Sequence, residues 1–273
     1  MSRPSWMRAF LAGAAGLALP WLGCTDTLSP DEPFSLEFEE LPSPSIVSGD
    51  TLRDLEGNAV PLRAIVYNFR GEPLEETDVS FVLIDTTGAI TLDPATGHVV
   101  ATGSRRGTVR VVASAGNLQS APLAFQIVPP PSAVARSGTI DTLRYSFSNP
   151  SLNTSVPLEV KVTWDSASAG VPAYVVQFRL EETSDTVVAR LVDDASRRSP
   201  LDPSGASSID TTESTGTRAG IAGRRIRLTP NASLGTPVDS IVVFADVRRH
   251  GEHISGSPVR LVLPVKPRTL TNP

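Results

Sequence analysis

The residues best suited to chemistry are two histidines that flank an acid in the run His250-Gly251-Glu252-His253. Two imidazoles at this spacing could hold a zinc ion, but such sites use a helix to aim both rings and need further ligands. Here the run lies between alternating apolar segments that end near Val247 and resume near Pro258, which predicts a hairpin turn. We therefore expect no metal site and no cofactor.

Catalytic residue patterns are also missing from the sequence. His98 follows a turn glycine and is expected to be an exposed strand residue, and Ser204-Gly205 lacks the Gly-x-Ser-x-Gly elbow of hydrolases. Asp93 could be considered a calcium ligand, but a single carboxylate falls short of the six to eight oxygens that calcium binds. The sequence thus predicts no catalytic residues and a protein that is not an enzyme.

Cys24, the only cysteine, is the remaining reactive residue. Arg3 and Arg8 precede an apolar stretch over residues 9–23, which is shorter than the roughly 20 residues of a membrane span. This pattern predicts a secretory signal peptide over residues 1–23. A lone thiol cannot form an internal disulfide and is a liability in an oxidising compartment, so lipidation explains it better than structure. The alternative is a small buried residue at the edge of the signal.

The junction Gly23-Cys24 resembles the lipobox of bacterial lipoproteins, although Trp21 stands where that family prefers leucine. The resemblance implies that a signal peptidase leaves Cys24 as the diacylated N-terminus, followed by a lipidated tether over residues 24–33. It also implies an exported protein that is lipid-anchored to the bacterial cell envelope, at the outer membrane or cell surface. The membrane would then be a partner through the N-terminal lipid.

Composition and charge indicate the fold class and exclude some partners. The 250 residues after the signal suffice for two domains, valine and threonine are abundant, and no long 3.6-residue apolar period is present, which favours an all-β protein. Losing Arg3 and Arg8 with the signal changes the formal net charge from −5 to about −7. This acidity argues against nucleic acid or an anionic membrane surface as a partner.

Period-two alternation predicts two β-sandwiches joined by a linker at residues 129–135, where Pro129-Pro130-Pro131 favours an extended spacer. The N-terminal unit spans 34–128 and the second spans 136–267, followed by a tail over 268–273. In the second unit Trp164 continues the series Leu158, Val160 and Val162, so we expect its ring inside the core.

The N-terminal unit is similar to bacterial Ig-like domains of group 2. The matching positions are Asp93, Thr96, Gly97, Val99, Gly107, Thr108, Val109, Val111 and Ala113. Phe81 stands where that family usually carries tryptophan, which implies a smaller aromatic core residue. Residues 210–245 loosely resemble the end of invasin-type Ig-like domains. Together these resemblances imply tandem Ig-like β-sandwiches.

The segment 193–217 is rich in Ser, Thr, Asp, Pro and Gly and is predicted to be a long mobile loop; the alternative is a solvated excursion with a short edge strand near residues 206–211. Arg197 and Arg198 could form a contact site for carboxylates there. We expect a non-catalytic lipid-anchored structural or adhesion module, with an envelope protein or glycan as its possible partner. The alternative is a carbohydrate-binding or substrate-presenting accessory lipoprotein, which would need a row of exposed aromatic residues.

Overall fold

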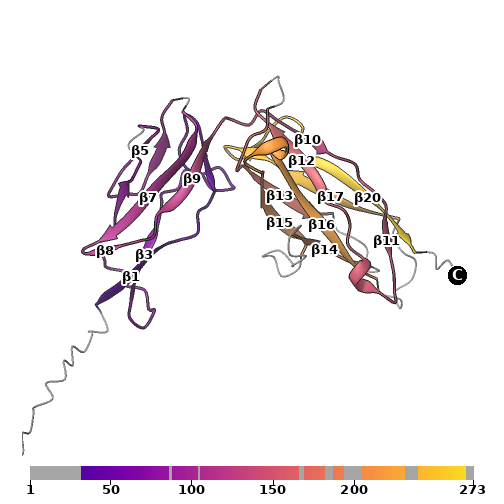
Figure 1. The fold of residues 1–273 in the computed structure, drawn as a ribbon, viewed down its shortest axis with the longest axis horizontal. Helices are drawn as coiled ribbons and strands as arrows, with labels where there is room; N and C mark the ends of the chain where they lie inside the picture. Colours follow the sequence, from indigo (N-terminus) through magenta and orange to yellow (C-terminus); the bar gives the residue numbers. More distant parts are fainter. Residues whose placement is uncertain are drawn as a thin grey trace, which may run out of the picture.

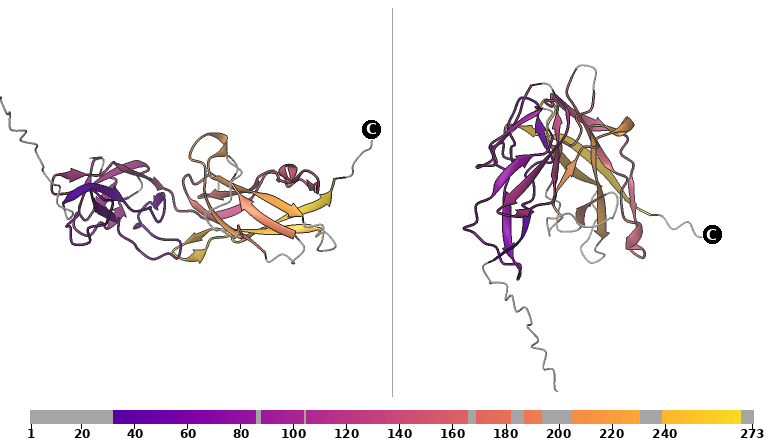
Figure 2. Two further views of the ribbon diagram at one scale, coloured as in Figure 1. Left: turned by 90° about the horizontal axis from the view of Figure 1, so that it is seen from below. Right: turned by 60° about the vertical axis from the view of Figure 1, so that its left-hand side comes forward.

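The computed structural model describes residues 32–85, 88–103, 105–165, 169–181, 187–193, 205–230 and 239–268. These residues form two β-sandwiches that meet at one end of each and are inclined to one another (Figure 1, Figure 2). The expected all-β fold is therefore confirmed. The predicted signal peptide, Cys24, Arg197 and Arg198 lie outside the described residues. Within the described residues no helix is long and apolar enough to cross a membrane.

The N-terminal sandwich is built from one larger sheet and two short antiparallel pairs. The larger sheet has the order β2 (Ser45–Val47), β9 (Leu123–Val128), β7 (Gly107–Ala115), β4 (Ser80–Leu83), and β8 (Leu118–Gln119) pairs with the end of β7. The pairs are β1 (Pro33–Phe38) with β3 (Ala64–Asn68), and β5 (Ile90–Leu92) with β6 (Val99–Ala101). Strand β2 runs parallel to β9, whereas the other pairings are antiparallel.

The core of this sandwich follows the predicted alternation. Val109, Val111 and Ala113 of β7 point inward and are almost completely buried. Phe81 is buried as expected, and its ring lies 6.1 Å from that of Phe38. The predicted turn at Asp93 is also present, because its carboxylate accepts backbone hydrogen bonds from Ala95 (2.9 Å) and Thr96 (3.2 Å).

The C-terminal sandwich packs two sheets face to face. One has the order β10 (Ala133–Ser137), β12 (Leu158–Thr163), β16 (Ile221–Pro230), β14 (Val187–Val192). The other has the order β11 (Leu143–Tyr145), β20 (Val259–Pro267), β17 (Ser240–Asp246), β13 (Val175–Leu180), β15 (Ser207–Thr211). Two single-turn 3-10 helices, η1 (Pro150–Leu152) and η2 (Gly216–Arg218), and the hairpin β18 (Arg248–Arg249) and β19 (Glu252–His253) complete the domain.

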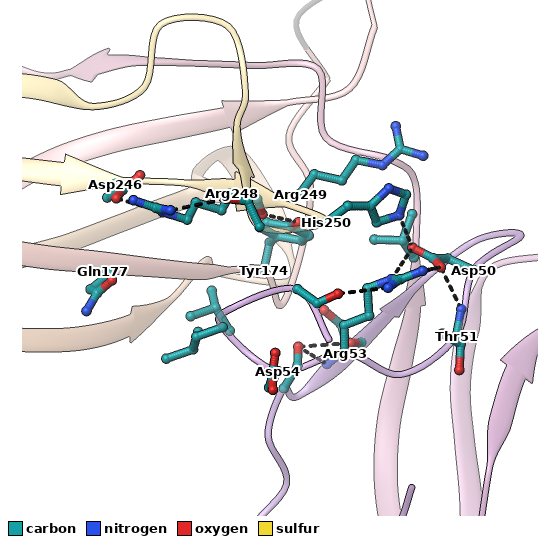
Figure 3. A pocket seen from close by; sticks show the side chains of 17 residues that line it. Asp50, Thr51, Arg53, Asp54, Tyr174, Gln177, Asp246, Arg248, Arg249 and His250 are labelled. Carbon is teal, nitrogen blue, oxygen red and sulfur yellow. Dashed lines mark hydrogen bonds and ion pairs between the residues drawn. The ribbon is translucent and has the colours of Figure 1, made fainter. Parts of the chain in front are cut away.

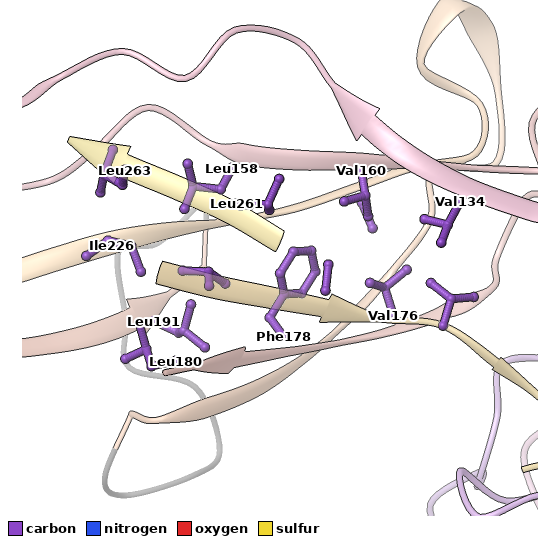
Figure 4. Packing of buried hydrophobic residues seen from close by; sticks show 14 of the residues in the cluster. Val134, Leu158, Val160, Val176, Phe178, Leu180, Leu191, Ile226, Leu261 and Leu263 are labelled. Atoms are coloured by element: carbon purple, nitrogen blue, oxygen red, sulfur yellow. The ribbon is translucent and has the colours of Figure 1, made fainter. Parts of the chain in front are cut away.

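Alternating residues of both sheets interdigitate between them (Figure 4). Phe178 lies in the middle of this core with no exposed surface, and Leu158 and Leu261 are likewise fully buried. Strand β15 is an edge strand that pairs with β13, so over Ser207–Thr211 the alternative prediction is confirmed and the predicted long mobile loop is wrong. It is integrated in the fold, since Leu180 N donates to Ala206 O (2.8 Å) and Leu191 N donates to Gly205 O (2.9 Å).

Two features differ from the sequence-based expectation. Strand β10 begins at Ala133, inside the segment 129–135 suggested as a spacer, and Pro129 and Pro131 are buried. The prolines fall between β9, which ends at Val128, and β10, so the missing N–H groups belong to no strand ladder. Trp164 packs against the core of the C-terminal sandwich as expected, but its side chain is only half-buried, because it lies at the end of β12 and its ring meets Arg106 of the N-terminal sandwich.

Candidate functional site

The most elaborate polar site of the described residues lies at the junction between the two sandwiches. A turn of the N-terminal sandwich over residues 50–57 meets the β18–β19 hairpin of the C-terminal sandwich (Figure 2). The imidazole Nε2 of His250 contacts the carboxylate of Asp50, 200 residues away in the sequence. We call the set formed by this turn and this hairpin the junction site (Figure 3).

The N-terminal half of the junction site is ordered by Arg53. Its guanidinium donates to the Asp50 carboxylate at 3.0–3.2 Å and, through Nη1, to Gly57 O at 2.8 Å, so it ties both ends of the turn together. Burial raises the pKa of Asp50, but hydrogen bonds from Arg53 and His250 lower this pKa more, and the net direction is downward. Asp50 is therefore ionised at neutral pH and accepts from both partners.

The hairpin half is ordered by the C-terminal sandwich itself. His253 Nδ1 lies 2.7 Å from Asp246 Oδ1, and Arg248 Nε lies 3.1 Å from the other oxygen of the same carboxylate. The Tyr174 hydroxyl donates to Arg248 O at 2.7 Å. At the tip His250 and Gly251 have φ angles of 53° and 80°. The predicted hairpin turn is confirmed.

The two histidines do not face a common point, because His250 contacts Asp50 and His253 contacts Asp246. In the described part of the chain no group of three or more His, Cys, Asp or Glu side chains could hold a metal ion. His98, expected on the surface, is exposed. Each histidine of the hairpin thus contacts a carboxylate.

Backbone atoms meet at the same place. A Cβ atom added to Gly57, whose φ is 91°, would lie 2.2 Å from Gly251 N, and one added to Gly251 would lie 2.5 Å from Glu56 O. No side chain fits at these distances, so the two glycines allow the turn and the hairpin to touch directly. The close approach excludes water between the two backbones.

Three further contacts join the domains. Val47 and Val128, from the ends of β2 and β9, belong to the apolar core of the C-terminal sandwich. The Arg106 guanidinium lies 4.0 Å from the centre of the Trp164 ring, a cation–π geometry. Gln126 Nε2 donates to Ser214 Oγ at 3.2 Å. Apolar, polar and backbone contacts therefore all act across one joint.

A cavity of about 70 Å³ lies within the junction site, lined by Arg53, Tyr174, Arg249 and other residues of both domains. Burial, with the charge of Asp50 adding to it, raises the pKa of Tyr174 to about 12 despite the opposing charge of Arg249. The Tyr174 hydroxyl thus stays neutral and keeps its hydrogen bond. A volume of this size accommodates a few water molecules. What the site can do is hold two domains in one arrangement.

Sequence reasoning did not identify the junction site. The sequence presents His250 only as a possible metal ligand and assigns no role to Asp50. One signal was available, since glycines stand at the tips of both turns, at Gly57 and Gly251. A single sequence does not reveal that these two glycines meet.

Comparisons with known proteins give remote matches only. No family model and no curated protein matches the chain. Among solved structures, adhesin InvE of Yersinia pseudotuberculosis is 14% identical, with a TM-score of 0.33, over 85% of this chain and 58% of that one. Domains 1–6 of surface layer protein SbsC are 12% identical, with a TM-score of 0.31, over 87% of this chain and 29% of that one.

Domains EC1-2 of human protocadherin-24 are 12% identical, with a TM-score of 0.27, over 87% of this chain and 100% of that one. The chain spans well under two thirds of SbsC domains 1–6 and of InvE. At these scores the matches carry no argument about function.

Proposed function

We propose that the protein is a non-catalytic, lipid-anchored spacer of the bacterial cell envelope that displays its C-terminal sandwich away from the membrane. The junction site carries this proposal. A flexible pair of domains would present no defined surface, whereas contacts of three kinds across one joint favour a stiff rod. Stiffness suits a structural or adhesion module whose outer domain contacts an envelope protein or a glycan.

The positions of the outer strands support the same proposal. Strand β1 begins at the end of the N-terminal sandwich that faces away from the junction, and β20 runs from the junction to the far end of the C-terminal sandwich (Figure 1, Figure 2). Cys24 precedes Pro33 by nine residues. A lipid on Cys24 would therefore hold the N-terminal sandwich near the bilayer and leave the C-terminal sandwich distal.

The carbohydrate-binding alternative is not favoured by the described aromatic residues. The ring of Trp164 is covered on one face by Arg106. The exposed phenylalanines do not form a row on one sheet face, since Phe34 and Phe69 lie at one end of the N-terminal sandwich and Phe147 lies on the C-terminal one. Sugar stacking would need several rings along one sheet face. We keep the group 2 and invasin-type Ig-like resemblances as proposals for the two domains.

The anchor is tested by growing cells with an alkyne-labelled fatty acid and comparing wild-type protein, Cys24→Ser and the control Ser29→Ala. Wild type and the control should incorporate label and sediment with membranes, because a diacylated cysteine adds apolar chains that the rest of the described chain does not supply. Cys24→Ser should remain unlabelled and leave the membrane fraction. Equal labelling of Cys24→Ser would contradict the proposal.

A further inference from the structure

The end of the N-terminal sandwich that faces away from the junction exposes two aromatic rings. Phe34 is 61% exposed and Phe69 is 40% exposed. The pairing of β1 with β3 matches Pro33 with Asn68 and Ser35 with Tyr67, so the two phenylalanines come from adjoining ends of neighbouring strands. In Figure 1 these strand ends lie where the chain enters the fold.

A β-bulge presents the first ring. The register of β1 against β3 shifts between Pro33 and Ser35, which leaves Phe34 as the additional residue. A bulge redirects a side chain that regular pairing would place on one face of the sheet. The backbone geometry of the bulge thus turns the Phe34 side chain outward at the start of β1.

A tight turn presents the second ring. The side-chain oxygen of Asn68, which is itself buried, accepts from Arg70 N (2.9 Å) and Glu72 N (3.0 Å), and Asn68 Nδ2 donates to Glu72 Oε2 (2.9 Å). Gly71 N closes the turn by donating to Asn68 O at 3.0 Å. The exposure of Phe69 is therefore built into an ordered turn, and binding through it costs little conformational entropy.

A cation accompanies the rings. The guanidinium of Arg70 lies 5.3 Å from the centre of the Phe69 ring, and Arg70 is exposed. Glu32 and Glu72 are exposed close by in the sequence. Arg70 suits a phosphate and the two glutamates suit ammonium groups, so the patch fits a surface that offers both kinds of charge next to apolar chains for the two rings. Zwitterionic phospholipid headgroups have this chemistry.

We propose that Phe34, Phe69 and Arg70, here called the aromatic end, dock on the phospholipid bilayer, with both rings in the interface and Arg70 at lipid phosphates. This inference rests on the proposed lipid anchor at Cys24. The nine residue steps from Cys24 to Pro33 reach at most about 30 Å when extended, so the anchor would keep the aromatic end at the membrane. The rod would then contact the bilayer with one defined end instead of lying on it.

The test uses the purified acylated protein in phosphatidylcholine vesicles with brominated acyl chains. In a Trp164→Phe background, Phe69→Trp places a fluorophore at the aromatic end, and Phe147→Trp is the control at a 56% exposed site of the other sandwich. Emission of Phe69→Trp should fall to about half, because rings buried about 5–10 Å in the interface are within reach of the bromines. Emission of the control should not change.

The outcomes separate the two proposals. Protein that fails to float with the vesicles shows that the lipid anchor is wrong, and the docking inference falls with it. Protein that floats but shows equal emission of both variants in brominated and plain lipid overturns the docking inference alone. A concentration-dependent emission shift of Phe69→Trp in lipid-free detergent would mean that a second copy covers the patch, which also overturns it.

Discussion

Each end of the N-terminal sandwich carries a turn that is closed by side-chain hydrogen bonds, but one turn is covered by the other domain and the other is exposed. At the junction Arg53 closes a turn by bonding to Asp50 and Gly57, and at the aromatic end Asn68 closes a turn by bonding to Arg70 and Glu72. The first turn is covered by the hairpin of the other domain, whereas the second leaves Phe69 exposed. Both turns therefore form preordered surfaces. Whether such a turn contacts the other domain or stays exposed depends on what surrounds it.

Two glycines express the contrast most simply. Gly57 and Gly71 have similar positive φ angles of 91° and 76°. A Cβ atom at Gly57 would lie 2.2 Å from Gly251 N, whereas one at Gly71 would have nothing within 4 Å. Both positions thus require glycine for its positive φ angle, but only at Gly57 would a side chain also clash with the other domain.

The largest effect is expected from Gly57→Ala compared with Gly71→Ala. Both substitutions place a side chain on a left-handed backbone, which costs about 1–2 kcal/mol. Gly57→Ala must in addition displace the hairpin, so calorimetry should show the two domains unfolding in separate transitions. Gly71→Ala should only lower the melting temperature of the N-terminal sandwich. Equal behaviour of the two variants would mean that the backbone contact at the junction is unimportant.

The next effect is confined to alkaline pH and leaves stability at neutral pH unchanged. Tyr174 ionises at a pKa near 10.0 when unfolded and at about 12 in the fold. Because its folded pKa is raised, its contribution to stability is complete below pH 10 and is lost as the pH rises through about 12, at about 1.4 kcal/mol for each unit of pKa difference. Ionisation also removes the hydrogen bond to Arg248 O.

This alkaline loss is measured by following Trp164 fluorescence, which reports on the junction, from pH 9 upward in chemical denaturation. The control variant is Tyr174→Phe, which should lose stability less steeply over the same range. Parallel curves for wild type and Tyr174→Phe would show that Tyr174 does not couple the hairpin to pH.

The smallest effect is expected from Arg106→Ala. Removing a cation from a partly exposed ring costs about 0.5–1 kcal/mol, and the uncovered Trp164 should emit at longer wavelength and be more accessible to iodide. Arg70→Ala removes the corresponding cation from Phe69 at the other end and should leave Trp164 emission unchanged. An unshifted spectrum for Arg106→Ala would show that the stacking is absent in solution.

Features of the fold that depend on neighbouring residues could be predicted from the sequence. Strands such as β7, β12, β17 and β20 follow from period-two alternation, because each residue that faces the core must be apolar. The turn at Asp93 follows from local side-chain bonding. These features depend on neighbours in the sequence and are therefore visible in it.

The junction site depends on residues far apart in the chain and could not be predicted. Alternation predicts that Trp164 packs on the core, which it does in part, but it does not predict that Arg106 of the other domain lies over the ring. His250 has a defined partner only because the domain arrangement brings Asp50 to it. The exposure of Phe34 likewise depends on a bulge that the sequence does not indicate.

The central claim, that the junction site holds the two sandwiches in one arrangement, is tested most directly by an interdomain distance distribution. Spin labels would be attached to Val100→Cys in β6 and Ile209→Cys in β15, two exposed strand positions, in a Cys24→Ser background, and measured by double electron–electron resonance. The account predicts a single narrow distance that broadens in Gly57→Ala. A broad distribution in the protein with an intact junction would contradict it.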